Sequence, residues 1–258
     1  MQIAIGTAVW GRPKTTELFW AAVDRLREQW AAHEVVAYAA GSEDAHRELT
    51  KRAGGVWVEF DNQPLGRKWN MVSRQAYRDG ADYLVILGSD DVLSPKMGER
   101  YLATMEQGVR YFGVRGCYMA EPWSRRAIHI QGHASQARLT EVVGAGRAVG
   151  RELLALADGA LWPDVARRGL DWLMTSRLRT LGVPGVDLIL PDDAEAFVLD
   201  IKGTQNMWPL DHVARYAPTQ AVDYTQLVAL LPVPERAILI KLEAARCSCC
   251  GQVRAEML

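Results

Sequence analysis

One stretch of this 258-residue chain is the strongest indication of its fold: Tyr83-Leu84-Val85-Ile86-Leu87-Gly88-Ser89-Asp90-Asp91-Val92-Leu93-Ser94-Pro95. Its first five residues are apolar or aromatic, too few for a helix and rich in strand formers, so they predict a strand buried on both faces. Two adjacent carboxylates follow, and Ser94-Pro95 provides an N-cap and a first-turn proline for the next helix. The carboxylates therefore lie at the carboxyl end of a central strand, where open α/β sheets bind their ligands.

Asp90 and Asp91 are the candidate metal ligands at this edge. Carboxylate oxygens suit a hard divalent cation, Mg²⁺ or Mn²⁺, which also binds the phosphate oxygens of a diphosphate. For the pair taken alone, the alternative is a solvated Asp-Asp turn without a metal. The rest of the chain has to decide between the two interpretations.

The composition is that of a globular protein, with 49% hydrophobic residues and a net charge of −1. Such a weak net charge excludes bulk electrostatic attraction of the whole molecule to nucleic acid or to an anionic membrane. Charge is nevertheless uneven, since eleven arginines and six acids lie between Arg110 and Arg179. No run of eighteen apolar residues and no basic-then-apolar N-terminus occurs, so we expect neither a membrane span nor a signal peptide. We expect a cytoplasmic location, in the host cytoplasm if a phage encodes the chain.

Three of the four cysteines cluster near the C-terminus, at Cys247, Cys249 and Cys250, whereas Cys117 is isolated. The Cys-Ser-Cys-Cys spacing lacks the paired C-x-x-C pattern and the nearby histidines of a zinc site. Reduced thiols in a C-terminal tail are the main interpretation. Metal binding by the three clustered cysteines is the alternative.

Strands and helices alternate along the first 108 residues. Apolar patterns predict strands at 2–8, 34–39, 56–60 and 83–87, and helices at 14–30, after a cap at Ser42, and up to Asp79. This alternation predicts parallel βαβ units with right-handed crossovers. The expected fold class is therefore α/β, a three-layer αβα sandwich around a mixed, mostly parallel central sheet.

The second half of the chain is less regular. We predict strands at 111–118, 127–131 and 197–201, and helices at about 148–157, 170–181 and 234–246. The stretch from Asp200 to Trp208 is unusually polar between apolar neighbours, and His212 follows it.

Five motifs follow one another along the chain in a fixed order. They are Thr7-Ala8-Val9-Trp10-Gly11-Arg12-Pro13, Leu65-Gly66-Arg67-Lys68-Trp69-Asn70, Gly88-Ser89-Asp90-Asp91, Gly144-Ala145-Gly146-Arg147 and Gly169-Leu170-Asp171-Trp172. This series resembles the family 2 nucleotide-sugar glycosyltransferases with the GT-A fold, over roughly residues 2–182. Two departures stand out. Ala39-Ala40-Gly41-Ser42 occupies the place of the family's Asp-Asp-Gly-Ser, with Glu43 and Asp44 just beyond, and Gly88 replaces the first Asp of the metal signature.

The resemblance implies inverting transfer of a sugar from a nucleotide diphosphate, most simply a UDP-sugar, to an acceptor hydroxyl, with Mn²⁺ or Mg²⁺. Asp171 falls on the catalytic base, although an acid in a first helical turn also serves as a simple dipole cap. The residues expected at the donor are Thr7, Ala8, Trp10, Arg12, Ser42, Gly66, Arg67, Lys68, Asn70, Ser89 and Asp90. Those expected at the acceptor are Trp123, Arg126, His133 and Trp172. The expected metal ligands are Asp90, Asp91 and the late His212.

The same resemblance divides the chain into a donor half at 1–108, an acceptor half at 109–217 and a C-terminal helical tail at 218–258. The eleven arginines of the middle third suit an anionic acceptor such as hydroxymethylated DNA, as in phage-type DNA glycosyltransferases. A catalytically inactive nucleotide-binding module is an alternative, because acids are missing at Ala39, Ala40 and Gly88. A dinucleotide-dependent oxidoreductase is another, because Val142 to Gly150 looks like a glycine fingerprint after a strand.

Overall fold

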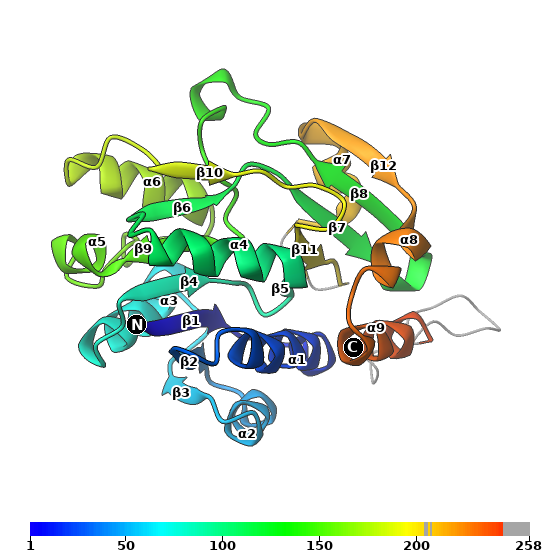
Figure 1. The fold of residues 1–258 in the computed structure, drawn as a ribbon, viewed down its shortest axis with the longest axis horizontal. Helices are drawn as coiled ribbons and strands as arrows, with labels where there is room; N and C mark the ends of the chain where they lie inside the picture. The colour runs from blue at the N-terminus through cyan, green and yellow to red at the C-terminus, as the bar shows by residue number, and fades with distance from the viewer. Residues whose placement is uncertain (204–205, 207, 245–258) are drawn as a thin grey trace.

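The structure is a computed structural model that describes residues 1–203, 206 and 208–244 (Figure 1). Its larger sheet has the strand order β10-β6-β9-β4-β1-β2-β3. β1, β2, β3 and β4 are mutually parallel, whereas β9 runs antiparallel to both β4 and β6. The strands are β1 Gln2–Ala8, β2 Glu34–Gly41, β3 Val56–Glu59, β4 Tyr83–Ile86, β6 Tyr111–Val114, β9 Arg147–Gly150 and β10 Leu188–Leu190.

Helices cover both faces of this sheet. Side chains alternate along each strand, so Ile3 and Ile5 pack with α1 (Pro13–Gln29) and α4 (Pro95–Glu106) on one face. Ala4 packs on the other face, which α3 (Leu65–Arg78), α5 (Arg151–Leu156) and α6 (Leu170–Thr180) cover. The short α2 (Asp44–Arg52) lies beside β3. The predicted three-layer α/β architecture with a mixed, mostly parallel sheet is confirmed.

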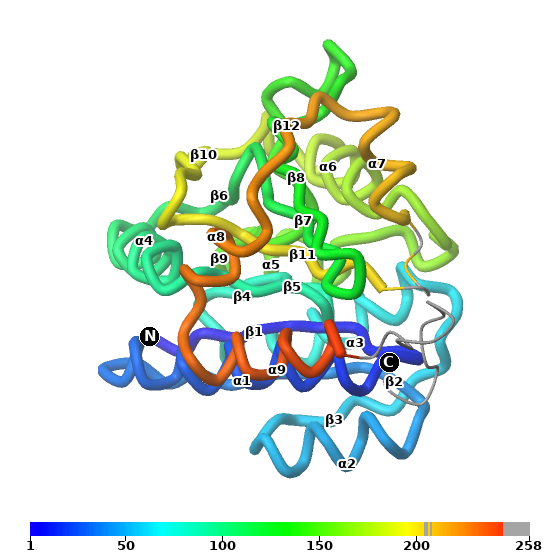
Figure 2. Tube along the Cα trace, turned by 90° about the vertical axis from the view of Figure 1, so that its right-hand side faces the viewer, coloured from blue at the N-terminus to red at the C-terminus, as the bar shows by residue number. Residues whose placement is uncertain are grey.

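A second sheet, which the sequence did not reveal, has the strand order β12-β8-β7-β11-β5 and is mostly antiparallel. A third apolar cluster joins it to α1 and to the last two described helices. Figure 2 shows α9 alongside α1. The elements of this part are β5 Asp91–Leu93, β7 Cys117–Glu121, β8 Arg126–Ile130, β11 Val198–Ile201, β12 Thr219–Val222, α7 Leu210–Tyr216, α8 Tyr224–Ala229 and α9 Val233–Glu243.

The helix predicted from about residue 148 is wrong in its first turn, because Arg147–Gly150 is the strand β9. Ala148 and Val149 are buried between β4 and β6, and a short apolar run does not distinguish a buried strand from a helix by periodicity. A dinucleotide fingerprint needs its glycines to lead into a helix at the phosphates. Here Gly144 and Gly146 lead into an antiparallel strand, which removes the basis of the oxidoreductase alternative.

Two smaller predictions also need correction. The expected strand 111–118 is broken at Gly116, where a Cβ would overlap with the carbonyl oxygen of Ile130, and its two halves belong to different sheets. Ser42 is exposed and does not cap α2, whose N-cap residue is Glu43.

Candidate active site

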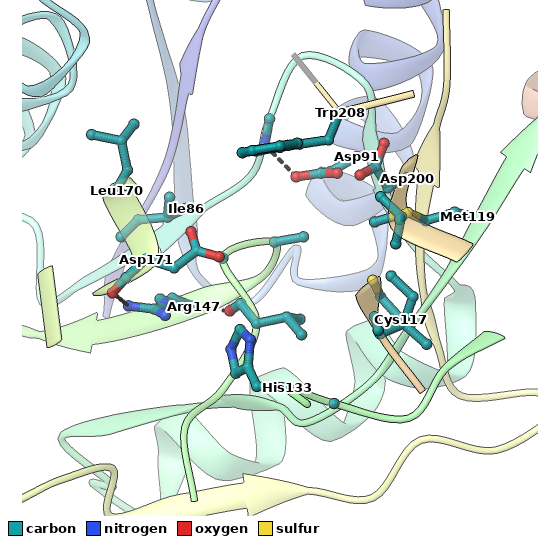
Figure 3. Close-up of a pocket in the computed structure, with 18 of the residues that line it drawn as sticks. Ile86, Asp91, Cys117, Met119, His133, Arg147, Leu170, Asp171, Asp200 and Trp208 are labelled. Carbon is teal, nitrogen blue, oxygen red and sulfur yellow. Dashed lines mark hydrogen bonds between the residues drawn. The ribbon is translucent and has the colours of Figure 1, made fainter. Parts of the chain in front are cut away.

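A cavity of about 590 Å³ opens where the carboxyl end of β4 meets the second sheet. Its walls come from β4, β7 and β11, the segment 132–147, and helices α6 and α7. Figure 3 shows Asp171 and Arg147 on one side of this cavity, and Asp91 and Asp200 on the other with Trp208 above them. Carboxylates from distant parts of the chain therefore face one cavity.

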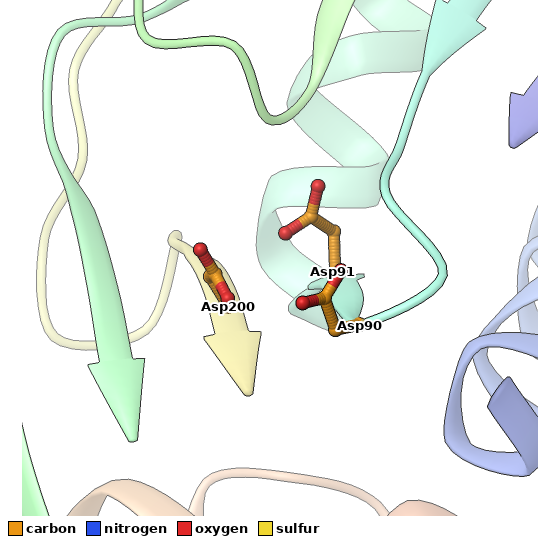
Figure 4. Close-up of side chains that lie close together, drawn as sticks. All are labelled: Asp90, Asp91 and Asp200. Carbon is orange, nitrogen blue, oxygen red and sulfur yellow. The ribbon is translucent and has the colours of Figure 1, made fainter. Parts of the chain in front are cut away.

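Three carboxylates form an acid group: Asp90, Asp91 and Asp200 (Figure 4). Each offers one oxygen, and these oxygens all lie within 4.8 Å of one another. The arrangement follows from strand pairing, since β5 runs antiparallel to β11 and places Asp91 opposite Asp200. The main-chain amide of Ile201 also donates to the carbonyl of Asp90 at 2.8 Å.

Because the three carboxylates are close together and buried, their pKa values differ from one another. Burial, together with Asp200 and Asp90, raises the pKa of Asp91 well above its usual range. Burial also raises the pKa of Asp200, although the neighbouring Lys202 opposes the shift. Asp90 behaves in the opposite way: burial works against its ionisation, but Arg12 and Lys202 outweigh it and lower the pKa of Asp90.

Four hydrogen-bond donors contact the acid group. Arg12 Nη1 donates to Asp90 Oδ2 at 2.6 Å, and Asn206 Nδ2 donates to the same oxygen at 2.7 Å. Lys202 Nζ donates to Asp200 Oδ2 at 2.6 Å, and the main-chain amide of Gly88 donates to Asp91 Oδ2 at 2.6 Å. Three carboxylates thus face two cations.

The acid group fits a hard divalent cation. All of its ligand atoms are carboxylate oxygens, the type that Mg²⁺ and Mn²⁺ prefer. Asp200 Oδ1 is buried and accepts no hydrogen bond from the described residues, so it is free to bind a metal. Among those residues no histidine or cysteine joins the group. His212 on α7 instead lies between the rings of Trp208 and Tyr216, and Cys247, Cys249 and Cys250 lie outside the described residues.

Asp171 lies in the first turn of α6, directly after Gly169 and Leu170. Its carboxylate rests against Gly144, where a Cβ would overlap with Asp171 Oδ1. Arg147 Nη1 holds the same turn through the main-chain carbonyl of Asp171 at 2.9 Å. The glycine-rich segment at 144–146 therefore supports the expected base.

The residues predicted at the acceptor separate into two groups. His133 lines the cavity, and burial together with Arg138 lowers its pKa. Arg138 can only donate, so the 3.1 Å contact from its Nη2 makes His133 Nε2 an acceptor in a neutral ring. The other three lie outside the cavity lining: Trp123, Arg126, which pairs with Asp211, and Trp172, which lies under Arg179.

Several residues predicted at the donor make close contacts with other parts of the chain. Lys68 is buried and donates to the carbonyl of Val9 at 2.6 Å, and burial lowers its pKa to about 8. Asn70 bonds to both the carbonyl and the amide of Trp162. Gly66 lies so close to Pro163 that a Cβ would overlap with the Pro163 carbonyl oxygen.

The remaining predicted donor residues come from the ends of β1, β2 and β4 and from α3. Of these, Asp90 lines the cavity, and Arg12 donates a hydrogen bond to Asp90. The others range from buried to exposed: Thr7 and Ser89 are buried, Ala8 ends β1 half-buried, and Trp10, Ser42 and Arg67 are exposed. Glu43, just beyond the place of the missing acids, accepts a hydrogen bond at its Oε2 from the amide of Gly11 at 2.6 Å.

Sequence reasoning missed Asp200, Lys202 and Asn206. A signal was present, because Asp200 and Lys202 are charged residues at the end of a predicted apolar strand. The position of Asp200 opposite Asp91 depends on antiparallel pairing between strands more than 100 residues apart, which a local pattern does not encode. The described helices are all too short or too polar to span a bilayer.

The fold is similar to that of TarS from S. aureus. A crystal structure of TarS 1–349 aligns with a TM-score of 0.53 and 12% identity, covering 78% of this chain and 60% of that one. The complex of TarS 1–349 with UDP gives a TM-score of 0.52 and 14% identity, with 95% and 71% covered. The complex with UDP-GlcNAc gives 0.50 and 12%, with 95% and 72% covered.

This chain thus spans about 60% of the length of the first of these proteins. No protein-family model matches the sequence, and no curated protein matches it. At such low identity the likeness concerns the fold, and it confirms the predicted GT-A-like α/β architecture.

Proposed function

We propose that this chain transfers a sugar from a nucleotide diphosphate sugar to an acceptor hydroxyl, with inversion and with Mn²⁺ or Mg²⁺. The observation that carries the proposal is that a three-carboxylate group suited to a cation and a separate carboxylate, Asp171, line the same cavity. A donor and an acceptor need these two groups at once. A module that only binds a nucleotide has no use for the second.

The donor is a UDP-sugar in this proposal, since structures of similar fold hold UDP and UDP-GlcNAc. Asp90, Asp91 and Asp200 would hold the metal, which when bound neutralises the negative charge that develops on the leaving diphosphate. Arg12 and Lys202 lie beside these carboxylates and supply further positive charge to phosphate oxygens. The half at 1–108 contributes Asp90, Asp91 and Arg12.

The acceptor reacts at Asp171 in the half at 109–217. The Asp171 carboxylate takes the proton of the acceptor hydroxyl while the hydroxyl oxygen forms a bond to the anomeric carbon. The bond from that carbon to the diphosphate oxygen breaks, and the nucleoside diphosphate leaves with the electron pair. A single displacement of this kind inverts the configuration at the anomeric carbon.

The experiment is a panel of UDP- and GDP-sugars incubated with the protein and Mn²⁺, with release of the nucleoside diphosphate as the readout. Asp171→Asn should lower release at least about 100-fold while UDP affinity stays within about twofold. The matched control is Asp158→Asn, an exposed aspartate with φ of 49°, a conformation that asparagine also tolerates. Absence of release from every sugar in the wild type, or loss of UDP affinity in Asp171→Asn, contradicts the proposal.

A further inference from the structure

Three aromatic side chains form a file at the mouth of the cavity, one just before α7 and two on it. The ring centroids of Trp208 and His212 lie 4.5 Å apart, and those of His212 and Tyr216 lie 4.6 Å apart. Trp208 lies two residues before α7 (Leu210–Tyr216), whereas His212 and Tyr216 are four residues apart on the helix and share one of its faces. We call Trp208, His212 and Tyr216 the aromatic file.

The aromatic file is exposed although it borders the candidate active site. Trp208 is 45% exposed and Tyr216 is 68% exposed, and both line the cavity that holds the acid group. The helix itself is anchored elsewhere, because Leu210 is buried and Val213 and Ala217 pack against the main core. Large aromatic surface at the rim of a cavity, without a role in core packing, is typical of a ligand-binding surface.

We propose that the aromatic file binds the acceptor, and that this acceptor is a neutral carbohydrate chain. The inference rests on the proposed sugar transfer at the same cavity. The C–H faces of a pyranose ring are apolar and stack on aromatic rings, while the hydroxyls at the ring edge remain in water. The ring centroids step by 4.5 and then 4.6 Å, so the file presents more than one ring to a bound sugar chain.

The direction of the file agrees with this role. Trp208 lines the same cavity as Asp91 and Asp200, and exposure rises from Trp208 to Tyr216 at the end of α7. A chain whose terminal sugar reaches the reaction centre would therefore rest its next units on the exposed rings of Trp208 and Tyr216, with His212 packed between them.

The charges around the cavity favour a neutral chain over a nucleic acid. Proteins that stack single-stranded nucleic acid on aromatic rings combine those rings with a positively charged groove. Here eight of the eleven arginines between Arg110 and Arg179 already bind internal partners, and Asp211 on α7 pairs with Arg126 at 2.6 Å. The eight are Arg110, Arg125, Arg126, Arg138, Arg147, Arg151, Arg177 and Arg179.

The experiment measures binding of neutral tetrasaccharides from cellulose, chitin and starch, and of a single-stranded oligothymidylate, by titration calorimetry and saturation-transfer NMR. Tyr216→Ala and His212→Ala truncate the file, and Trp57→Ala is the matched control on the far edge strand β3. UDP affinity with Mn²⁺ is measured for every variant, and thermal melts verify folding.

We expect at least one neutral tetrasaccharide to bind the wild type, about tenfold or more weakly to both file variants, and equally well to the Trp57 variant. Binding should change less than twofold between about 50 and 300 mM salt. Equal affinity in the file variants, no binding of any neutral tetrasaccharide, or salt-sensitive binding of the oligothymidylate instead overturns the inference. Because UDP affinity is recorded separately, a wild type that binds no UDP with Mn²⁺ defeats the proposed transfer, whereas UDP binding without sugar binding defeats only the acceptor inference.

Discussion

Arg147→Met tests how α6 and its Asp171 are held in place. The Arg147 side chain is 1% exposed and lies between β9, the segment before it and α6. Its Nε donates to the carbonyl of Val143 at 3.1 Å, Nη2 to that of Val142 at 2.9 Å, and Nη1 to that of Asp171 at 2.9 Å. One guanidinium thus joins the glycine-rich segment to the helix turn that carries the proposed base.

Methionine has a similar length but no donor, so three main-chain carbonyls lose a charged partner. Hydrogen bonds to charged groups contribute about 1.5–3 kcal/mol each, or about 6 kcal/mol for three. Removing a buried charge recovers part of this, because keeping an ion out of water costs several kcal/mol. We therefore expect the free energy of unfolding to fall by about 3 kcal/mol. Arg147→Lys keeps the charge on a single nitrogen and should lose about half as much.

The assay is urea unfolding followed by circular dichroism, with Arg177→Met as the matched control. Arg177 lies on the same helix and donates through Nε to one main-chain carbonyl, that of Ala160, so its loss should cost about 1 kcal/mol. A free energy of unfolding for Arg147→Met within about 0.5 kcal/mol of the wild type would refute the reasoning.

Three further predictions concern residues near the site. Because burial lowers the pKa of Lys68 from 10.5 to about 8, the folded state binds fewer protons than the unfolded state between those values. Stability should therefore rise by about 3 kcal/mol across this pH window in the wild type relative to Lys68→Met, and parallel pH profiles in urea unfolding would contradict this. Gly144→Ala should push the Asp171 carboxylate aside and lower sugar-nucleotide turnover about tenfold or more with little change in melting temperature, whereas unchanged turnover would show that the contact is unimportant. Asn70→Ala should lower stability by about 2–3 kcal/mol without weakening UDP binding, because its amide holds Trp162; weakened UDP affinity at unchanged stability would return Asn70 to the donor site.

The parts of the fold that the sequence predicted are those that local patterns encode. A short apolar run ending in two acids predicted β4, and a cavity lies at the carboxyl end of that strand. Ser94 was predicted to cap the next helix, and its hydroxyl accepts from the amide of Met97 as expected of an N-cap. Both features depend on residues that are only a few positions apart along the chain.

The parts that the sequence did not predict depend on partners far along the chain. Arg147–Gly150 is a strand because it pairs with both β4 and β6, and the four residues alone contain no pattern that predicts a strand. Asp200 joins the acid group through pairing with β5, whereas the expected third ligand, His212, stacks on Trp208. Lys68 and Asn70 have polar side chains of the kind expected at a ligand site, but both donate hydrogen bonds to main-chain carbonyls, those of Val9 and Trp162.

The most direct test of the central claim is titration calorimetry of UDP with and without Mn²⁺ for the wild type, Asp90→Ala and Asp200→Asn. If the three carboxylates hold a cation that binds the diphosphate, Mn²⁺ should raise the UDP affinity of the wild type about tenfold or more, and both variants should lose that gain. UDP affinity that is the same with and without Mn²⁺, or a gain that survives in both variants, would contradict it.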